Sequence, residues 1–229
     1  VTNANNCSST ASATVTVNPN PTAGVNTPSP ICVGQSASLT ATGGGTYSWS
    51  TGATTANINV SPATTTTYIV TVTNANNCSS TASATVTVNP LPTPSVSAPS
   101  PICVGQSATL TASGGTNYQW NTGANTASIT VSPGSTTTYT VTVTSAAGCS
   151  ATASGTVTVN PLPTPSVSAP APICVGQSAT LTASGGTNYI WNTGSTSATI
   201  NVSPSTTTTY TVTVTNANGC SATASGTVT

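Results

Sequence analysis

The 229-residue chain contains no lysine, arginine, aspartate, glutamate or histidine. A soluble domain of this length ordinarily carries about 57 charged residues. Proton transfer near neutral pH needs a side chain that titrates there, and most protein metal sites need carboxylate or imidazole ligands. Serine, threonine and cysteine nucleophiles are plentiful, but no base is present to activate them. The sequence therefore predicts no catalytic residue, no metal site, no cofactor and no enzymatic activity.

The same absence limits the partners of the chain. Without a cation there is nothing to displace the counterions of a nucleic acid, so we expect no nucleic-acid binding. No apolar run is long enough to predict membrane insertion within this segment. Methionine is also absent, and residues 1–19 match only the last part of a repeat. We therefore expect the sequence to be a window of a longer chain.

Hydroxylated residues take the place of the charges. The chain has 54 threonines and 33 serines, with 19 glycines and 17 prolines beside them. Disordered chains usually combine high net charge with few β-branched residues, whereas threonine and valine dominate here. The composition therefore favours β-structure over disorder.

The cysteines reveal an internal repeat. Their separations alternate between 25 and 46 residues, which gives a period of 71 residues that the tryptophans and several tyrosines share. We call Cys32, Cys103 and Cys174, each within Pro-Ile-Cys, the PIC cysteines. The others, which we call turn cysteines, follow a predicted strand and an Asn- or Gly-containing turn: Cys7, Cys78, Cys149 and Cys220.

The period defines the predicted domains. It is longer than most solenoid repeats and suits small autonomous domains, which we place at residues 20–90, 91–161 and 162–229. Residues 1–19, the N-terminal segment, repeat the sequence of residues 72–90. We interpret this segment as the C-terminal strand segment of a preceding repeat. It would permit strand exchange with a neighbour, although the complete last copy disfavours that arrangement.

Short strands separated by turns are visible in the second copy. Apolar residues alternate with hydroxylated ones in 107–112, 117–120, 128–133, 139–144 and 155–159. Between these runs lie turn sequences rich in glycine, asparagine and proline. Six or seven short strands in 71 residues, without helical periodicity, predict an all-β fold built as a tandem array of small β-sandwich domains.

A resemblance to known repeats agrees with this prediction. The string PICVGQSATLTASGG, then W-x-T-G, I-x-V-x-P and T-T-T-Y-x-V-T-V-T, resembles the tandem immunoglobulin-like and PKD-like repeats of large secreted or surface proteins of Bacteroidetes-type bacteria. The resemblance covers every copy. It implies immunoglobulin-like sandwiches, an extracellular or cell-surface location and an adhesive or scaffolding role.

Disulfides are the predicted use of the cysteines. Antibody domains bridge their B and F strands, but the matching inward positions here are Ala41 and Val70. We therefore predict bridges within each repeat, pinning the A strand beside the start of the G strand, with reduced thiols as the alternative. Cys7 would pair upstream of the window or link two chains. The predicted pairs are Cys32 with Cys78, Cys103 with Cys149, and Cys174 with Cys220.

The aromatic residues have two possible roles. Trp49, Trp120 and Trp191 could stack on sugar rings, but we expect them to fill the cores of their domains. Tyr68, Tyr139 and Tyr210 open the predicted F strands, where a buried ring with its hydroxyl bonded to backbone is typical of immunoglobulin-like domains. We therefore interpret these six residues as core aromatics, with ligand binding as the alternative.

The threonine runs are candidates for modification. Outward-facing threonines such as Thr71, Thr73, Thr85 and Thr87 could form a solvated surface, carry O-linked glycans, or pack against neighbouring chains or ice. Glycans would help to keep an uncharged surface soluble. The glycosylation candidates lie in the loop before the F strand, at Thr64, Thr65, Thr66, Thr67, Thr136, Thr137, Thr138, Thr206, Thr207, Thr208 and Thr209.

Proline-rich connectors complete the picture. Residues 89–101 contain five prolines, which favour a semi-rigid connector, and we expect its Val96 to pair as an A strand. Repetition, crosslinking and stiff connectors together predict a structural component of an extracellular filament, stalk or fibre, with copies of itself and covalent glycans as partners. The alternative is an adhesin or glycan-binding module of a large cell-surface protein.

Overall fold

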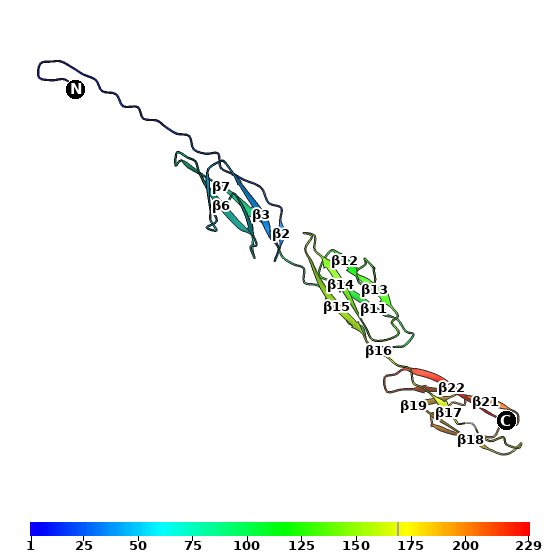
Figure 1. Ribbon diagram of the computed structural model, residues 1–229. Helices are drawn as coiled ribbons and strands as arrows, with labels where there is room; N and C mark the ends of the chain where they lie inside the picture. The colour runs from blue at the N-terminus through cyan, green and yellow to red at the C-terminus, as the bar shows by residue number, and fades with distance from the viewer. Residues whose placement is uncertain (169) are drawn as a thin grey trace. The chain divides into compact units, whose positions relative to one another are not determined.

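The chain is entirely β in the part that the structure describes. The computed structural model describes residues 1–168 and 170–229, and these form strands and turns without any helix (Figure 1). No helix in these residues could therefore span a membrane. The chain divides into two compact units, one of Val1–Leu91 with Ala147–Cys149 and one of Pro92–Ala146 with Ser150–Thr229. The predicted all-β tandem array is confirmed.

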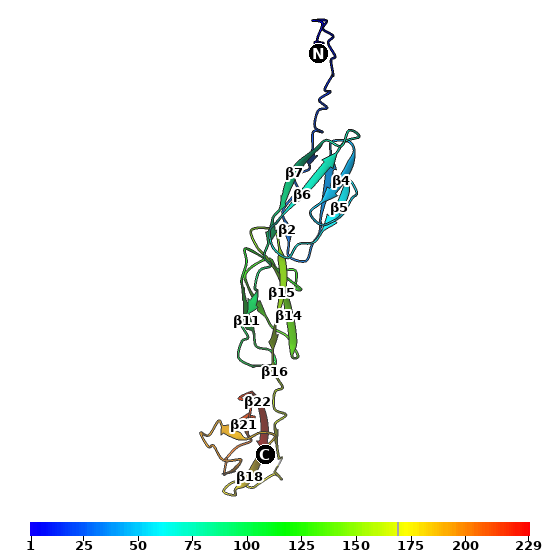
Figure 2. The ribbon, with the colours of Figure 1, turned by 90° about the vertical axis from the view of Figure 1, so that its left-hand side faces the viewer.

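The first unit contains one complete sandwich. One sheet has the order β1-β3-β5 and the other the order β4-β6-β7, while β2 pairs with β8 in a separate short ladder. This is the A-B-E and C-F-G arrangement of an immunoglobulin-like sandwich. Figure 2 shows β6 and β7 side by side. The strands are β1 (Gly24–Val25), β2 (Ile31–Cys32), β3 (Ala37–Thr42), β4 (Thr46–Trp49), β5 (Asn57–Val60), β6 (Thr66–Thr73), β7 (Ser79–Val86) and β8 (Val88–Asn89).

The second unit contains two further sandwiches with the same strand order. The second repeat has the sheets β9-β11-β13 and β12-β14-β15, and β10 pairs with β16. Its strands are β9 (Ser95–Val96), β10 (Ile102–Cys103), β11 (Ala108–Ser113), β12 (Asn117–Trp120), β13 (Ser128–Val131), β14 (Thr137–Thr144), β15 (Ser150–Val157) and β16 (Val159–Asn160). The predicted pairing of Val96 as an A strand is confirmed by its register opposite Ala112.

The third repeat has the sheets β17-β18-β20 and β19-β21-β22. Unlike the first two repeats, it has no strand at its Pro-Ile-Cys sequence among the described residues. Its strands are β17 (Ser166–Val167), β18 (Ala179–Ser184), β19 (Asn188–Trp191), β20 (Thr199–Val202), β21 (Thr208–Thr215) and β22 (Ser221–Val228).

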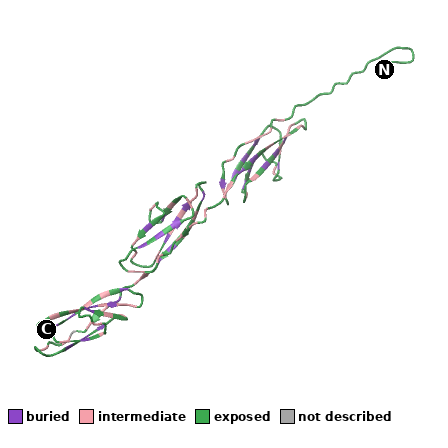
Figure 3. Cartoon of the chain, turned by 180° about the vertical axis from the view of Figure 1, so that it is seen from behind, coloured by how far each residue is buried: buried purple, intermediate pink, exposed green. Residues whose placement is uncertain are grey.

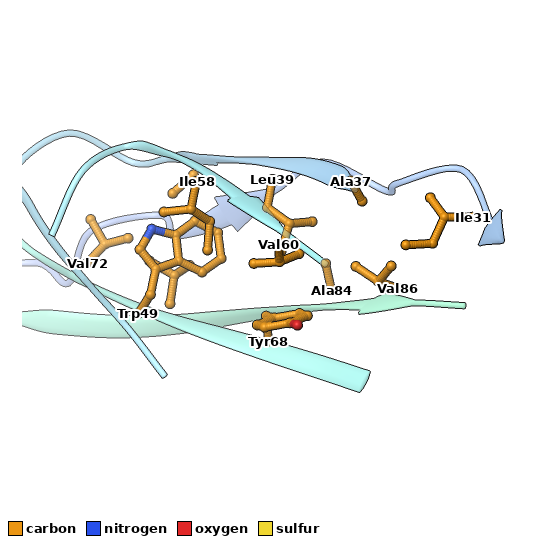
Figure 4. Close-up of a cluster of buried hydrophobic side chains, with 12 residues drawn as sticks. Ile31, Ala37, Leu39, Trp49, Ile58, Val60, Tyr68, Val72, Ala84 and Val86 are labelled. Carbon is orange, nitrogen blue, oxygen red and sulfur yellow. The ribbon is translucent and has the colours of Figure 1, made fainter. Parts of the chain in front are cut away.

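Alternation along each strand builds the cores. In β3, β11 and β18 every second residue is buried, and the intervening serines and threonines face solvent. Each repeat has its own cluster of buried side chains. Figure 4 shows the cluster of the first repeat, where Trp49, Leu39 and Val72 lie between the strands of the two sheets. Ala41 and Val70, the positions that a B–F bridge would use, are both buried in this cluster.

The predicted core role of the tryptophans agrees with the structure. Trp49, Trp120 and Trp191 are only 2–3 % exposed, and each indole N–H donates to a backbone carbonyl at 2.9 Å. The rings of Tyr68 and Tyr139 are also buried, while that of Tyr210 is half-buried.

The expected hydrogen bond of the F-strand tyrosines is not found among the described residues. The tyrosine hydroxyls that do donate are those of Tyr118 and Tyr189, to the carbonyls of Gly115 and Gly186 at 3.0 and 2.9 Å. These tyrosines lie in β12 and β19, which are the C strands. The hydroxyl-to-backbone bond is therefore made by C-strand tyrosines and not by the predicted F-strand tyrosines.

The N-terminal segment forms no sandwich strand. Residues 1–20 are all exposed (Figure 3), and an isolated bridge joins Thr2 and Ser8. Val17 is 86 % exposed, whereas Val88, its equivalent one period later, lies in β8 and packs against the first core.

Candidate functional site: disulfides between repeats

Each turn cysteine is held by the turn that carries it. Between β6 and β7, the side-chain oxygen of Asn74 accepts hydrogen bonds from the backbone N–H groups of Asn76 and Cys78, both at 3.0 Å. Asn77 has a φ of 58°, a left-handed conformation that asparagine tolerates better than most residues. Glycines with positive φ, Gly148 and Gly219, occupy this position in the other two repeats. These turn residues therefore fix the position of the cysteine, which directly precedes the G strand.

Each of the first two PIC cysteines is held at the end of its sandwich. Cys32 lies in β2, which runs parallel to β8 with Cys32 opposite Asn89. The N–H of Ile31 donates to Thr87 O at 2.9 Å, and that of Val33 donates to Asn89 O at 3.1 Å. β10 and β16 repeat this register.

Two disulfides connect a PIC cysteine with the turn cysteine of the next repeat. Cys32 is bonded to Cys149 and Cys103 to Cys220, and each bond spans 117 residues of sequence with a Cα–Cα distance of 5.6 Å. The sulfur of Cys149 lies 3.9 Å from the carbonyl oxygen of Asn89, the residue opposite Cys32. Asn89 is therefore next to both halves of the first bridge.

The predicted pairing within each repeat was wrong. Cys78 lies before β7, whereas Cys32 lies opposite Asn89, which follows β7. Eleven residues of extended chain separate these two positions, which is roughly 36 Å at about 3.3 Å per residue. A disulfide requires Cα atoms only about 4.4–6.8 Å apart. The strand β2 pairs with β8, beyond the end of the G strand β7, and not beside the start of that strand. Cys32 is therefore placed where the cysteine of the next repeat can bond to it.

Three cysteines have no disulfide partner within the described part of the chain. Cys7 and Cys174 are exposed and Cys78 is partly buried. The sulfur of Cys78 lies 3.7 Å from the carbonyl oxygen of Asn18. This reproduces the contact of Cys220 with Asn160 at 3.9 Å in the third repeat. The predicted bridge of Cys174 with Cys220 is likewise wrong, because Cys220 is bonded to Cys103.

The threonines predicted as glycosylation candidates use most of their hydroxyls internally. Those that lie in the F strands themselves, and not in the loops before them as predicted, are Thr66, Thr67, Thr137, Thr138, Thr208 and Thr209. Thr66, Thr137 and Thr208 each donate to the carbonyl oxygen two residues earlier, at 2.7–2.8 Å. The next threonines form hydroxyl pairs across to the G strand, which join Thr67 with Thr85, Thr138 with Thr156 and Thr209 with Thr227. Thr65 and Thr136 accept from the backbone N–H groups of Val88 and Val159 at 3.0 Å. On the outer face of the F and G strands Thr85 lies opposite Thr67, and Thr71 lies opposite Thr81. The predicted outward-facing threonines Thr71 and Thr73 therefore do not pair with Thr85 and Thr87.

Shallow polar hollows recur beside the C and F strands. One, of about 330 Å³, is lined by Asn117, Gln119 and Thr142 among others in the second repeat. Another, of about 540 Å³, is lined by Asn188, Ile190 and Thr215 among others in the third. Their walls offer amides and hydroxyls without charge.

Comparison with known proteins gives structural neighbours only. No family model and no curated protein matches the chain. The N-terminal eight immunoglobulin domains of Down syndrome cell adhesion molecule are 16 % identical over 92 % of this chain, with a TM-score of 0.41. This chain spans 42 % of that protein chain. A Ca²⁺-stabilised adhesin of an Antarctic bacterium is 17 % identical over 92 % of this chain and 74 % of its own, with a TM-score of 0.40. A glucan-utilisation protein of Bacteroides ovatus, SGBP-B, is 17 % identical over 94 % of this chain and 68 % of its own, with a TM-score of 0.24.

The identities and TM-scores are low, so they transfer no ligand and no activity to this chain. The disulfides, in contrast, are a property of this chain itself.

Proposed function

We propose that this chain is a structural segment of an extracellular fibre or stalk in which disulfides connect each repeat to the next. The observation that supports this proposal most strongly is the pairing of Cys32 with Cys149 and of Cys103 with Cys220. Each bridge adds a second covalent connection beside the proline-rich connector. A bridge within a repeat would stabilise only that repeat, whereas these bridges hold neighbouring repeats together under load.

The chemistry also supports a location outside the cytoplasm. Disulfides persist in oxidising compartments and are reduced by cytosolic thiols. The absence of charged side chains fits a structural role, because cohesion between such units is insensitive to the screening of charges by salt.

The fibre proposal is tested on intact cells of the source organism. An antibody raised against the chain and detected by immunogold electron microscopy is expected to label fibres or stalks along their whole length. Label confined to the cytoplasm of permeabilised cells would contradict the proposal. Label restricted to the tips of fibres would favour the second candidate.

The second candidate is an adhesin or glycan-binding module. The polar hollows lined by Asn117 and Gln119, and by Asn188 and Thr215, favour it because uncharged amides and hydroxyls can hydrogen-bond sugars. Each of the two repeats would then offer one site.

We further propose O-linked glycans on the loops before the F strands. Among the candidates, the hydroxyls of Thr64 and Thr206 make no hydrogen bond within the described residues, whereas those of Thr66 and Thr67 are engaged. Intact mass of the protein purified from its source is expected to exceed the sequence mass by whole sugar units. Peptide mapping should place sugars on Thr64 and Thr206 before Thr66 and Thr67. An unmodified mass would reject the glycan proposal.

A further inference from the structure

One turn of the third repeat contains a reactive pair of residues. Asn218-Gly219, in the turn between β21 and β22 that carries Cys220, is the only Asn-Gly pair in the sequence. The other two repeats have Asn76-Asn77 and Ala147-Gly148 at this place. Glycine has no side chain, so its backbone nitrogen is open to the side-chain amide of the asparagine before it. The pair therefore places an electrophilic amide carbon beside a nitrogen that no side chain shields.

The side chain of Asn218 is free to react. Asn218 and Gly219 are both exposed, so water reaches them. In the part of the chain that the structure describes, no residue forms a hydrogen bond with the side-chain amide of Asn218. Its backbone N–H donates to the side-chain oxygen of Asn216 at 3.0 Å. The amide can therefore turn toward Gly219 without breaking a hydrogen bond of its own.

Asn216 restrains the nitrogen that must attack. The N–H of Gly219 donates to Asn216 O at 3.0 Å, and the N–H of Cys220 donates to the side-chain oxygen of Asn216, also at 3.0 Å. An amide nitrogen becomes a nucleophile when it loses its proton, and a hydrogen bond donated by the neutral N–H opposes that loss. The hydrogen bonds to Asn216 thus slow the attack in the folded turn, and opening the turn releases it.

We propose that Asn218 is a deamidation site, at which the chain converts its own asparagine to aspartate and isoaspartate. The deprotonated nitrogen of Gly219 bonds to Cγ of Asn218, and the side-chain nitrogen leaves as ammonia. Water then opens the succinimide ring that has formed. Attack on the Cγ carbonyl restores the original main chain and leaves an aspartate, whereas attack on the backbone carbonyl leaves isoaspartate, whose main chain runs through Cβ and Cγ. In total one water is consumed, and the ammonia takes up the proton of the new carboxyl group.

The product changes the turn that positions one half of a bridge. The sequence has no aspartate or glutamate, so each conversion gives the chain a side-chain carboxylate that it otherwise lacks. Two hydrogen bonds of 2.9 and 3.0 Å join Asn216 to Cys220, and isoaspartate lengthens the main chain between these residues by one atom. Cys220 forms the bridge to Cys103. This inference goes beyond the proposed role in a fibre and does not depend on it.

The test follows the oxidised full chain in warm, mildly alkaline buffer. Because the chain has no charged side chain, each conversion is resolved as a more acidic band by isoelectric focusing. This band is expected to accumulate with time, and peptide mapping after a pepsin digest in acid should place aspartate and isoaspartate at position 218. Asn218→Ala recreates the Ala-Gly pair of the second repeat and should remove the band. A band of unchanged intensity in this variant, or no band in the original chain, would overturn the inference.

The restraint by Asn216 is tested with a matched pair of variants. Asn216→Ala removes the side-chain acceptor of two N–H groups in the turn and is expected to speed the conversion several-fold. Asn74→Ala makes the same change in the first repeat, whose turn has no Asn-Gly pair, and should leave the rate unchanged. Tryptophan fluorescence checks that both variants are folded. Equal rates in the two variants would overturn the role assigned to Asn216.

The two proposals can fail separately. Immunogold label on fibres whose protein never develops the acidic band would reject this inference alone. An acidic band from a protein that is labelled only in the cytoplasm would reject the proposed function alone.

Discussion

The fully unfolded, oxidised chain is expected to stretch only about 160 Å between Cys32 and Cys220 under force, which corresponds to about 46 residues at about 3.4 Å each. The reduced chain should reach about 640 Å over about 188 residues. The reason is the crossed pairing of the cysteines. The shortest covalent route from Cys32 crosses the bond to Cys149, follows the backbone back to Cys103 and crosses the bond to Cys220. It contains only the segment between Cys103 and Cys149, whereas a route through one bond alone contains about 71 residues.

Removal of one bridge should lengthen the chain only partly. With Cys32→Ser and Cys149→Ser the force still passes through the Cys103–Cys220 bond, so the limit should rise from about 46 to about 71 residues. The pair Cys103→Ser and Cys220→Ser should behave in the same way. The limit should rise to about 188 residues only when all four cysteines are replaced. Single-molecule force spectroscopy with handles at both termini measures these lengths.

A bridge within each repeat would give a different pattern. The limit would be about 50 residues, and removal of any one bridge would add about 46. A gain of about 46 residues on removal of one bridge would contradict the crossed pairing, which predicts a gain of about 25 residues. The crossed pairing suits a load-bearing fibre, since one broken disulfide would lengthen the chain by less than the loss of a bridge within a repeat.

Much of the fold followed from the sequence because it is encoded locally. Alternating residues in β11 and β12 place Leu110 and Trp120 on inward faces, and glycines at the turns end the strands. The three tryptophans keep the period of the cysteines, so a core role in one repeat implied it in all. These features need no knowledge of contacts between distant residues.

The cysteine pairing could not be obtained in this way. A 71-residue period is consistent both with pairs inside a repeat and with pairs between neighbours, because each repeat contains one PIC cysteine and one turn cysteine. The choice depends on which end of the sandwich carries Cys32, and that is set by the two-residue ladder of β2 and β8. A ladder of only two residue pairs is too short to produce a recognisable alternation of apolar and polar residues in the sequence.

One feature of the sequence nevertheless indicated which end of the sandwich carries Cys32. Valines continue to alternate beyond the G strand, at Val86 and Val88 and again at Val157 and Val159. This alternation indicates that the extended chain runs past the sandwich before the first proline. The role of Asn89 beside both halves of a bridge was not foreseen, because an isolated asparagine in a proline-rich connector resembles an ordinary turn residue.

Peptide mapping of the non-reduced protein tests the central claim most directly. Trypsin has no site in this chain, so the digest requires a protease such as pepsin, followed by mass spectrometry with and without reductant. The account predicts peptides that join Cys32 to Cys149 and Cys103 to Cys220 and that separate on reduction. Peptides that join Cys32 to Cys78, or Cys103 to Cys149, would contradict it.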